Sequence, residues 1–291
     1  MSKRKRPNFL DLPAKYSNPA SARYGVLPVP YEGTVSYGTG TAEGPAAIID
    51  ASAAVELFDE ELKAEFFHAG VATYPPVAPR RTPAAQMKAV YAAAAAIVGE
   101  GKFLLGLGGE HSVTAPMVQA VIEKHGPVSV LQIDAHADLR DSYEGSKHSH
   151  ASVMRRVMEM TPRICQVGIR SLSREEFEQC PAEAANFITP AIIHSDPRWI
   201  ERALALLGPK VYVTIDIDGL DPAFAPGTGT PEPGGLNWFQ ITALLREVCT
   251  HRQVLAADVV EVAPLEGNPV TEFVAARLAY KLIAYTSLHG H

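Results

Sequence analysis

The 291-residue sequence predicts an α/β protein of three layers, α/β/α, with a mostly parallel sheet between two layers of helices. Short runs rich in Val, Ile and Leu alternate with helix-like segments along the whole chain. Most of these runs are apolar at consecutive positions, as expected for parallel strands that helices cover on both faces. Hydrophobic residues make up 47% of the chain, enough for a core on each side of such a sheet. The steady alternation of strand and helix, without a long linker, favours one three-layer domain.

Six apolar runs have the length of strands and are expected to form the sheet: Tyr24–Val29, Phe103–Leu107, Val128–Asp134, Ile164–Ile169, Val211–Asp216 and Val254–Val260. Helical patterns lie between them. The clearest helix starts after Thr82, a capping residue, has Pro83 in its first turn and runs to about Gly99. The other expected helices are Val113–His125, Ala151–Glu159, Arg198–Leu207, Trp238–Cys249 and Thr271–Tyr285. The segments 28–45 and 222–235, rich in proline and glycine, are expected to be loops.

The N-terminus and the composition limit the partners of the chain. We expect residues 1–22 to form a tail and residues 23–291 to form a single domain. No apolar segment follows the basic start, Met1–Arg6, so it is not a secretory signal. Because the net charge is −6 and no second basic cluster is present, we expect a solvated tail and no nucleic-acid partner. No apolar run approaches the roughly 20 residues of a membrane span, and three cysteines without a CxxC pair suit the cytoplasm.

The strongest functional signal lies at the end of the third expected strand, in the segment Asp134-Ala-His136-Ala-Asp138. On an extended chain, residues two apart point the same way, so the three polar side chains would share one face at spacings of about 6–7 Å. Two carboxylates and an imidazole on one face are costly without a cation between them. A polar loop is the alternative, and the pattern favours a metal site.

Two further clusters follow other expected strands. Asp216 and Asp218 lie at the end of one strand, and His111 follows the glycine pair after another. Ligands in α/β sheets collect at the carboxyl ends of strands, where all three clusters are placed. Four Asp and two His exceed what one ion normally takes from protein, and they suit a two-metal site with bridging carboxylates. Oxygen-rich ligands with some imidazole favour Mn²⁺ over Zn²⁺.

Several segments match the motifs of one enzyme family. They are Gly108–Thr114, Asp134–Asp138, Ser149–Ser152, Asp216–Pro222, Pro226–Gly227, Gly234–Gly235 and Glu261–Pro264. They resemble the ureohydrolases, which include arginase and agmatinase, and agmatinase is the nearer of the two. The resemblance covers nearly the whole chain and implies an eight-stranded sheet, two Mn²⁺ per chain with Co²⁺ or Ni²⁺ as substitutes, and a homo-oligomer, either a trimer or a hexamer. It implies six ligands, the same as above: His111, Asp134, His136, Asp138, Asp216 and Asp218.

The resemblance also implies a mechanism, in which a metal-bridging hydroxide attacks a guanidino carbon and releases urea and an amine. A guanidinium is resonance-stabilised and stays charged near neutral pH, so its carbon needs a strong nucleophile. The leaving amine must gain a proton, and His150 matches the residue that delivers it, with His148 in the same loop as a rival. Glu261 matches the carboxylate that pairs with the guanidinium, which Thr230 and His150 help to hold. Asp138, a ligand, takes part in catalysis as well.

The sequence favours agmatine as the small cationic substrate, which gives putrescine and urea, a step of polyamine biosynthesis. The loop 139–148 does not show the pattern of Asn and Ser residues with which arginases bind the substrate carboxylate. Ser173 stands where arginases place an Asp for the α-amine. Charges in the loop cancel in a formal count: Asp141 and Glu144 against Arg140 and Lys147. Aminopropylagmatine and guanidinobutyrate remain as alternative substrates, followed by arginine.

Three other classes fit the sequence less well. A deacetylase on the same fold would hold one zinc and lack the paired Asp motifs. A dinuclear phosphoesterase would need an Asn-His motif and basic phosphate-binding groups near the clusters. A non-catalytic regulator should have lost a ligand or the proton-carrying histidine, and none is missing. We therefore expect a hydrolase that acts on the C–N bonds of linear amidines.

Overall fold

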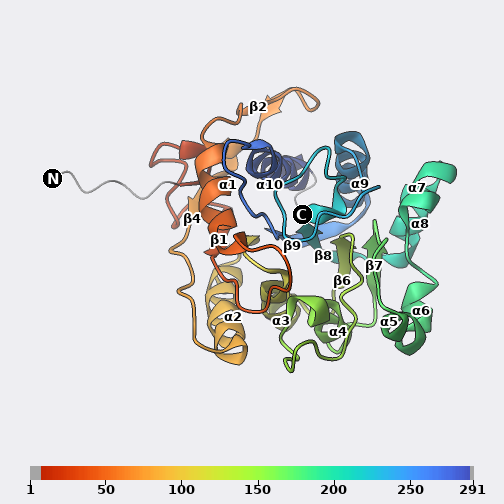
Figure 1. Ribbon diagram of the computed structural model, residues 1–291. Helices are drawn as coiled ribbons and strands as arrows, with labels where there is room; N and C mark the ends of the chain where they lie inside the picture. Colours follow the sequence, from red (N-terminus) through yellow and green to blue (C-terminus); the bar gives the residue numbers. More distant parts are fainter. Residues whose placement is uncertain (1–7, 289–291) are drawn as a thin grey trace.

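The computed structural model describes residues 8–288, and its centre is a parallel sheet of seven strands (Figure 1). All neighbouring pairs are parallel, in the order β4-β1-β5-β9-β8-β6-β7. The strands are β1 (Tyr24–Val29), β4 (Val71–Thr73), β5 (Phe103–Gly108), β6 (Ser129–Ile133), β7 (Ile164–Val167), β8 (Lys210–Asp216) and β9 (Gln253–Val260). A separate antiparallel hairpin joins β2 (Phe58–Asp59) to β3 (Ala64–Glu65).

Helices cover both faces of the sheet, since neighbouring residues along a strand point to opposite sides. Leu104 and Leu105 of β5 belong to two different apolar cores for this reason. One layer consists of α1 (Gly44–Ser52), α8 (Trp199–Leu206), α9 (Trp238–His251) and α10 (Val270–Leu288). The other consists of α2 (Pro83–Gly99), α3 (Thr114–His125) and α4 (Val153–Met158). The predicted three-layer α/β/α architecture is confirmed.

All six predicted strands are present, with bounds that differ by at most two residues. The main sheet has seven strands in the described residues, where the resemblance implied eight. Beside β7, at the place of a further strand, Ile188 forms only a single parallel bridge with Val167. Pro190 then begins α7, and because proline lacks an N–H group the pairing cannot continue. Strand β4 was missed because three residues are too few to show a period.

The six predicted helices are present as well. Thr82 caps α2 as predicted: its hydroxyl oxygen accepts the N–H of Ala85 over 3.3 Å, and Pro83 is the first helical residue. Helix α1 begins at Gly44, inside a segment that was expected to be loop. Three short helices at the β7 edge were also missed, because none has enough turns for a visible period: α5 (Arg174–Gln179), α6 (Pro181–Ala184) and α7 (Pro190–Ser195). No helix in residues 8–288 is long and apolar enough to cross a membrane.

The N-terminal segment packs on the domain from Asn8 onward. Phe9, Leu10 and Leu12 are buried in the core on the α1 side, and the N–H of Leu10 donates to the hydroxyl of Ser52 in α1 over 2.7 Å. The basic residues Met1–Arg6 lie outside the described part of the chain. A domain boundary at residue 22 therefore stays a prediction.

Candidate metal centre and substrate pocket

The carboxyl ends of four central strands meet at one place. Strands β5, β9, β8 and β6 are neighbours and parallel, so they end at the same edge of the sheet. Each is followed or closed by an ionisable residue: His111 after β5, Glu261 after β9, Asp216 at the end of β8 and Asp134 after β6. The topology thus brings together residues that are up to 150 positions apart.

One group of potential ligands surrounds His111. Its Nδ1 lies 3.1 Å from Oδ2 of Asp134, 3.2 Å from Oδ2 of Asp138 and 3.3 Å from Oδ2 of Asp216. All four side chains are buried. This Nδ1 has no hydrogen-bond partner, although it is shielded from solvent. A buried nitrogen without a partner, facing three carboxylates, is the arrangement expected where a cation binds.

A second group shares Asp134 with the first. It consists of Asp134, His136 and Asp218, whose ligand atoms lie within 4.8 Å of one another. Nδ1 of His136 is 3.0 Å from Oδ2 of Asp218 and 3.6 Å from Oδ1 of Asp134. Asp134 therefore directs one carboxylate oxygen to each histidine, which is the geometry of a bridging carboxylate between two cations.

The backbone brings these residues together by a different route from the one expected. Strand β6 ends at Ile133, so the segment 134–138 is a loop and not an extended strand. Asp138 has a left-handed backbone with φ 55°, which is unfavourable for a residue with a side chain. The N–H of Met154 holds it there by donating to its carbonyl over 3.1 Å. Asp218 likewise lies in a 3₁₀ turn after β8. The prediction that these side chains share a face because they alternate along an extended strand was wrong. The loop and the 3₁₀ turn nevertheless bring them close together.

The charges of the site require compensation. Burial, together with Asp218 and Asp134, raises the pKa of Asp216 well above its usual range. Burial alone would lower the pKa of His136, but Asp134 and Asp218 raise it to about 12. Without cations, the negative charge of the four carboxylates is thus compensated only by protons that stay on groups such as Asp216 and His136. Two divalent cations would balance the same charge, and the oxygen and imidazole donors fit hard cations of this kind.

Buried polar residues behind the site hold the ligands in place. Nε2 of His111 lies 2.9 Å from Oγ1 of Thr214, whose hydroxyl donates to Asp258 over 2.6 Å. Tyr212 and Thr114 also donate to Asp258, and burial raises the pKa of this carboxyl. Partners of this kind fix the orientation of metal ligands. Asp258 was not predicted as a functional residue, although an Asp inside an apolar strand is a visible signal in the sequence.

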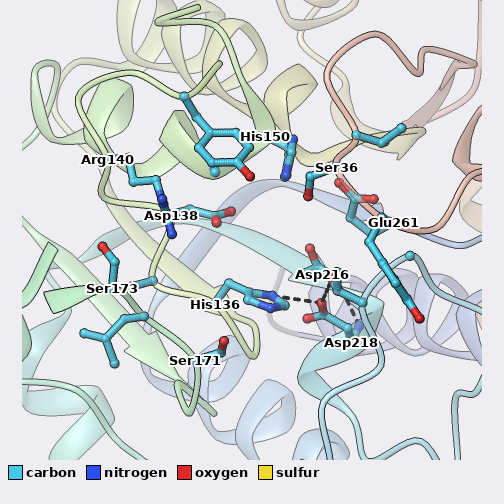
Figure 2. Close-up of a pocket in the computed structure, with 18 of the residues that line it drawn as sticks. Ser36, His136, Asp138, Arg140, His150, Ser171, Ser173, Asp216, Asp218 and Glu261 are labelled. Atoms are coloured by element: carbon cyan, nitrogen blue, oxygen red, sulfur yellow. Dashed lines mark hydrogen bonds and ion pairs between the residues drawn. The ribbon is translucent and has the colours of Figure 1, made fainter. Parts of the chain in front are cut away.

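A cavity of about 230 Å³ opens above the two ligand groups. Its floor contains four of the expected ligands, His136, Asp138, Asp216 and Asp218, with Glu261 beside them (Figure 2). A cavity of this size suits a small molecule with a short chain. The wall and the mouth are formed by residues from several loops, from the 3₁₀ turn before α4 and from α5: Val35–Gly38, Arg140, Tyr143, His150, Ser171–Ser173, Glu176 and Thr230.

The sequence and the fold both match those of known proteins. The model of the arginase family matches residues 22–284. The chain belongs to the arginase family. It is 40% identical over 274 residues to the N(1)-aminopropylagmatine ureohydrolase of Synechocystis sp., covering 91% of this chain and 90% of that one. It is 35% identical to the agmatinase of Bacillus subtilis, covering 81% and 82%. The crystal structure of the agmatine ureohydrolase of Thermoplasma volcanium has a TM-score of 0.84 at 33% identity, covering 92% and 91%.

Membership in the arginase family confirms the predicted ureohydrolase resemblance and the arginase-like fold. The predicted enzyme class, a hydrolase of guanidino C–N bonds, is confirmed as well. The family and the two ligand groups that share Asp134 together support a dimetal site.

Of the two loop histidines, only His150 lines the pocket of this ureohydrolase. Its Nδ1 lies 3.2 Å from Oγ1 of Thr34, and the Thr34 hydroxyl donates to Glu110 over 2.8 Å. Glu110 is fully buried and also accepts the N–H of Thr34 over 2.6 Å. His148 is exposed and lies outside the lining. Thr34 and Glu110 were not predicted as functional residues, because they are 76 positions apart and meet only in the folded chain.

Glu261 is tied to the first ligand group through the backbone. Its Oε1 accepts the N–H of His111 over 2.6 Å, and its own φ of 61° is left-handed. Burial and the nearby Glu110 raise the pKa of Glu261 well above its usual range. A cationic group in the pocket would therefore stabilise the charged form of this carboxyl. Thr230, also in the lining, donates to Oδ2 of Asp218 over 3.2 Å.

The loop before α4 places one cation in the ureohydrolase pocket and another outside it. Nε of Arg140 lies 3.6 Å from Oε2 of Glu176, and its guanidinium carbon lies 4.9 Å from the ring centre of Tyr143. Lys147 is not part of the lining and pairs with Asp141 over 3.3 Å. The charge of Lys147 is thus compensated by Asp141, as the formal count predicted. Arg140 pairs instead with Glu176, a residue that the sequence analysis did not single out.

Proposed function

We propose that the chain is a manganese-dependent ureohydrolase that converts agmatine and water to putrescine and urea. One observation carries the proposal: Asp134 directs its two oxygens to the histidines of two ligand groups, and other members of both groups line the floor of one small pocket. A dimetal centre of this kind is suited to hydrolysis. Relatives named agmatinase and N(1)-aminopropylagmatine ureohydrolase support the choice of a guanidino substrate.

Six residues would hold the two cations: His111, Asp134, His136, Asp138, Asp216 and Asp218. Bound divalent cations would supply Lewis acidity and lower the pKa of a water between them. The mixture of carboxylate and imidazole donors favours Mn²⁺, with Co²⁺ and Ni²⁺ as substitutes. Asp134 would contact both cations, since it belongs to both groups.

Glu261 pairs with the guanidinium of the substrate in this proposal, and Thr230 helps to hold it. A guanidinium is planar, carries five N–H donors and keeps its charge at neutral pH. Glu261 is only 8% exposed, so the charge-assisted hydrogen bonds form where water competes weakly. Asp138 lines the floor and, besides its role as a ligand, orients the attacking water.

His150 delivers the proton that the leaving amine requires. Cleavage of the C–N bond would otherwise expel a strongly basic amide ion, so a positioned acid is needed at this point. Nδ1 of His150 is engaged by Thr34, which leaves Nε2 for proton transfer. The exposed position of His148 makes it a weaker candidate for this role.

N(1)-aminopropylagmatine is the second candidate substrate. The chain is 40% and 37% identical to ureohydrolases named for this compound, and 36% and 35% identical to agmatinases. Guanidinobutyrate and arginine are less favoured, because the cation in the pocket lining, Arg140, already pairs with Glu176. The fixed carboxylate of Glu176 would repel a substrate carboxylate at this place.

A urea-release assay with Mn²⁺-loaded protein tests the proposal. Agmatine, N(1)-aminopropylagmatine, 4-guanidinobutyrate and arginine are compared at equal metal content. We expect agmatine or its aminopropyl form to exceed arginine in kcat/KM by about a hundredfold or more. Absence of urea with all four compounds would refute the function, and equal efficiency with arginine would refute the choice of substrate.

We further propose that residues 23–291 form one domain that assembles into a trimer or a hexamer in the cytoplasm. Phe239 of α9 is 80% exposed and Phe273 of α10 is 39% exposed. Contact between subunits at these side chains would remove their apolar surface from water, which supports an assembly. Three buried free thiols suit a reducing compartment: Cys165, Cys180 and Cys249. Light scattering during size-exclusion chromatography measures the assembly, and a monomer would contradict it.

A further inference from the structure

A fixed carboxylate lies in the wall of the pocket. Glu176 is only 3% exposed. Its Oε1 accepts the N–H of Leu139 over 2.9 Å, and its Oε2 accepts the N–H and the hydroxyl of Ser173 over 2.7 and 2.8 Å. These bonds use three of about four acceptor positions of a carboxylate. Glu176 is therefore held in one orientation and retains room for one further donor.

Arg140 is the cation beside this carboxylate, and it is held loosely. The distance of 3.6 Å from its Nε to Glu176 is too long for a hydrogen bond. Its second contact is with the face of Tyr143, 4.9 Å from the ring centre. About a third of the Arg140 side chain, 35%, is exposed to solvent. Partly exposed ion pairs and cation–π contacts are both weak, so Arg140 can leave at small cost.

An aromatic face next to an anchored carboxylate is a binding site for a cation, and the guanidinium of the chain itself occupies it. We infer that Arg140 is the residue that determines specificity for the far end of the substrate. The ammonium of an aminoalkyl tail displaces Arg140 from Glu176 and Tyr143 and takes its place. One cation replaces another, so the net charge of the site does not change. The inference rests on the proposed ureohydrolase function and deepens it, because it names the residue that sets the preference among substrate tails of different charge.

The same arrangement predicts the opposite effect for an anionic tail. A carboxylate would pair with the Arg140 guanidinium itself and would be repelled by Glu176. Removing the charge of Arg140 should therefore favour amine-tailed compounds and disfavour carboxylate-tailed ones. Opposite changes for two tails on one guanidino group cannot result from general damage to the catalytic centre.

The test uses Arg140→Gln, which removes the charge and keeps a polar side chain. For each variant, kcat/KM of Mn²⁺-loaded protein is measured for agmatine, N(1)-aminopropylagmatine, 4-guanidinobutyrate and 1-butylguanidine. The last compound has a neutral tail and serves as the reference, so effects on the common guanidinium end cancel. We expect the ratio of an amine-tailed compound to the reference to rise about tenfold, mainly through KM, the factor expected for the loss of two weak contacts. Lys147→Gln, in the same loop but outside the lining, should leave all ratios unchanged.

A second variant keeps the test independent of Glu176, whose replacement could disturb the loop that it anchors. Adding Tyr143→Leu to Arg140→Gln should remove the gain for amine-tailed compounds, because the aromatic face is lost. Unchanged ratios in Arg140→Gln, or a gain that persists without Tyr143, would overturn the inference. Calorimetric binding of agmatine and 1-butylguanidine gives the same ratio without turnover. A protein that binds but releases no urea would thus refute the proposed function, while the binding ratio still decides the role of Arg140.

Discussion

His111 and Glu261 are joined by one hydrogen bond, in which the backbone N–H of His111 donates to Oε1 of Glu261 over 2.6 Å. The first residue is a proposed metal ligand, and the second is the proposed partner of the guanidinium. The bond connects the segments that follow β5 and β9, which are neighbours in the sheet. The spacing between the metal centre and the substrate-binding carboxylate is therefore set by the rigid core of the fold.

Glu261→Gln should separate the charge of this residue from its structural role. The amide oxygen can still accept the N–H of His111, while the charge that pairs with the guanidinium is lost. We expect kcat/KM to fall by about a hundredfold or more, with two cations still bound and an unchanged melting temperature. Steady-state urea release and metal analysis measure both effects. Glu266→Gln, an exposed glutamate nearby, is the control, and wild-type activity in Glu261→Gln would contradict the assignment.

Asp134→Ala and Asp218→Ala should each abolish metal-dependent activity. Asp134 belongs to both ligand groups, so its loss should affect both cations, whereas loss of Asp218 should weaken the second group first. Elemental analysis after dialysis against limiting Mn²⁺ measures the number of bound ions. Asp50→Ala, on the exposed side of α1, should retain both ions. Two tightly bound ions and full activity in Asp134→Ala would rule out the bridging role.

His150→Ala should reduce kcat by about a hundredfold or more, the usual effect of a positioned proton-transfer group. His148→Ala should have little effect, because this residue is exposed and outside the lining. Thr34→Val removes the hydroxyl that holds Nδ1 of His150, and we expect an intermediate loss. Single-turnover kinetics with metal content at two ions per chain measures the step itself. If the two histidine variants gave the reverse result, the proton would come from His148.

Lys281→Met should destabilise the fold without acting on the site. Lys281 is 2% exposed and lies 2.9 Å from both Asp59 and Glu61, so it joins α10 to the β2–β3 hairpin. Its removal leaves the buried charge of Asp59 without its cationic partner, which typically costs about 3–5 kcal/mol. The free energy of unfolding is measured by urea denaturation. Arg277→Met, which breaks a partly exposed pair with Glu60, should change it by less than about 1 kcal/mol, and equal effects of the two variants would contradict the prediction.

Local sequence patterns predicted much of this molecule for physical reasons. Strand β8 is apolar at consecutive positions because helices cover both of its faces, and its bounds were predicted to within one residue. Parallel strands place their carboxyl ends at one edge of a sheet. The position of His111, Asp134 and Asp216 after separate strands was therefore enough to predict that they meet. The α/β class, the family and the candidate ligands were all available from the sequence.

Contacts between distant segments were decided by the tertiary structure alone. Asp258 supports Thr214 across two strands, Glu110 holds the loop at Thr34, and Arg140 faces Glu176. None of these pairs follows from a local period, because each depends on the order and register of the strands and on backbone angles in loops. The sequence by itself determined the family and the candidate metal ligands. Only the tertiary structure decided how they are oriented and which charge lines the pocket, because those properties arise where separate loops pack against one another.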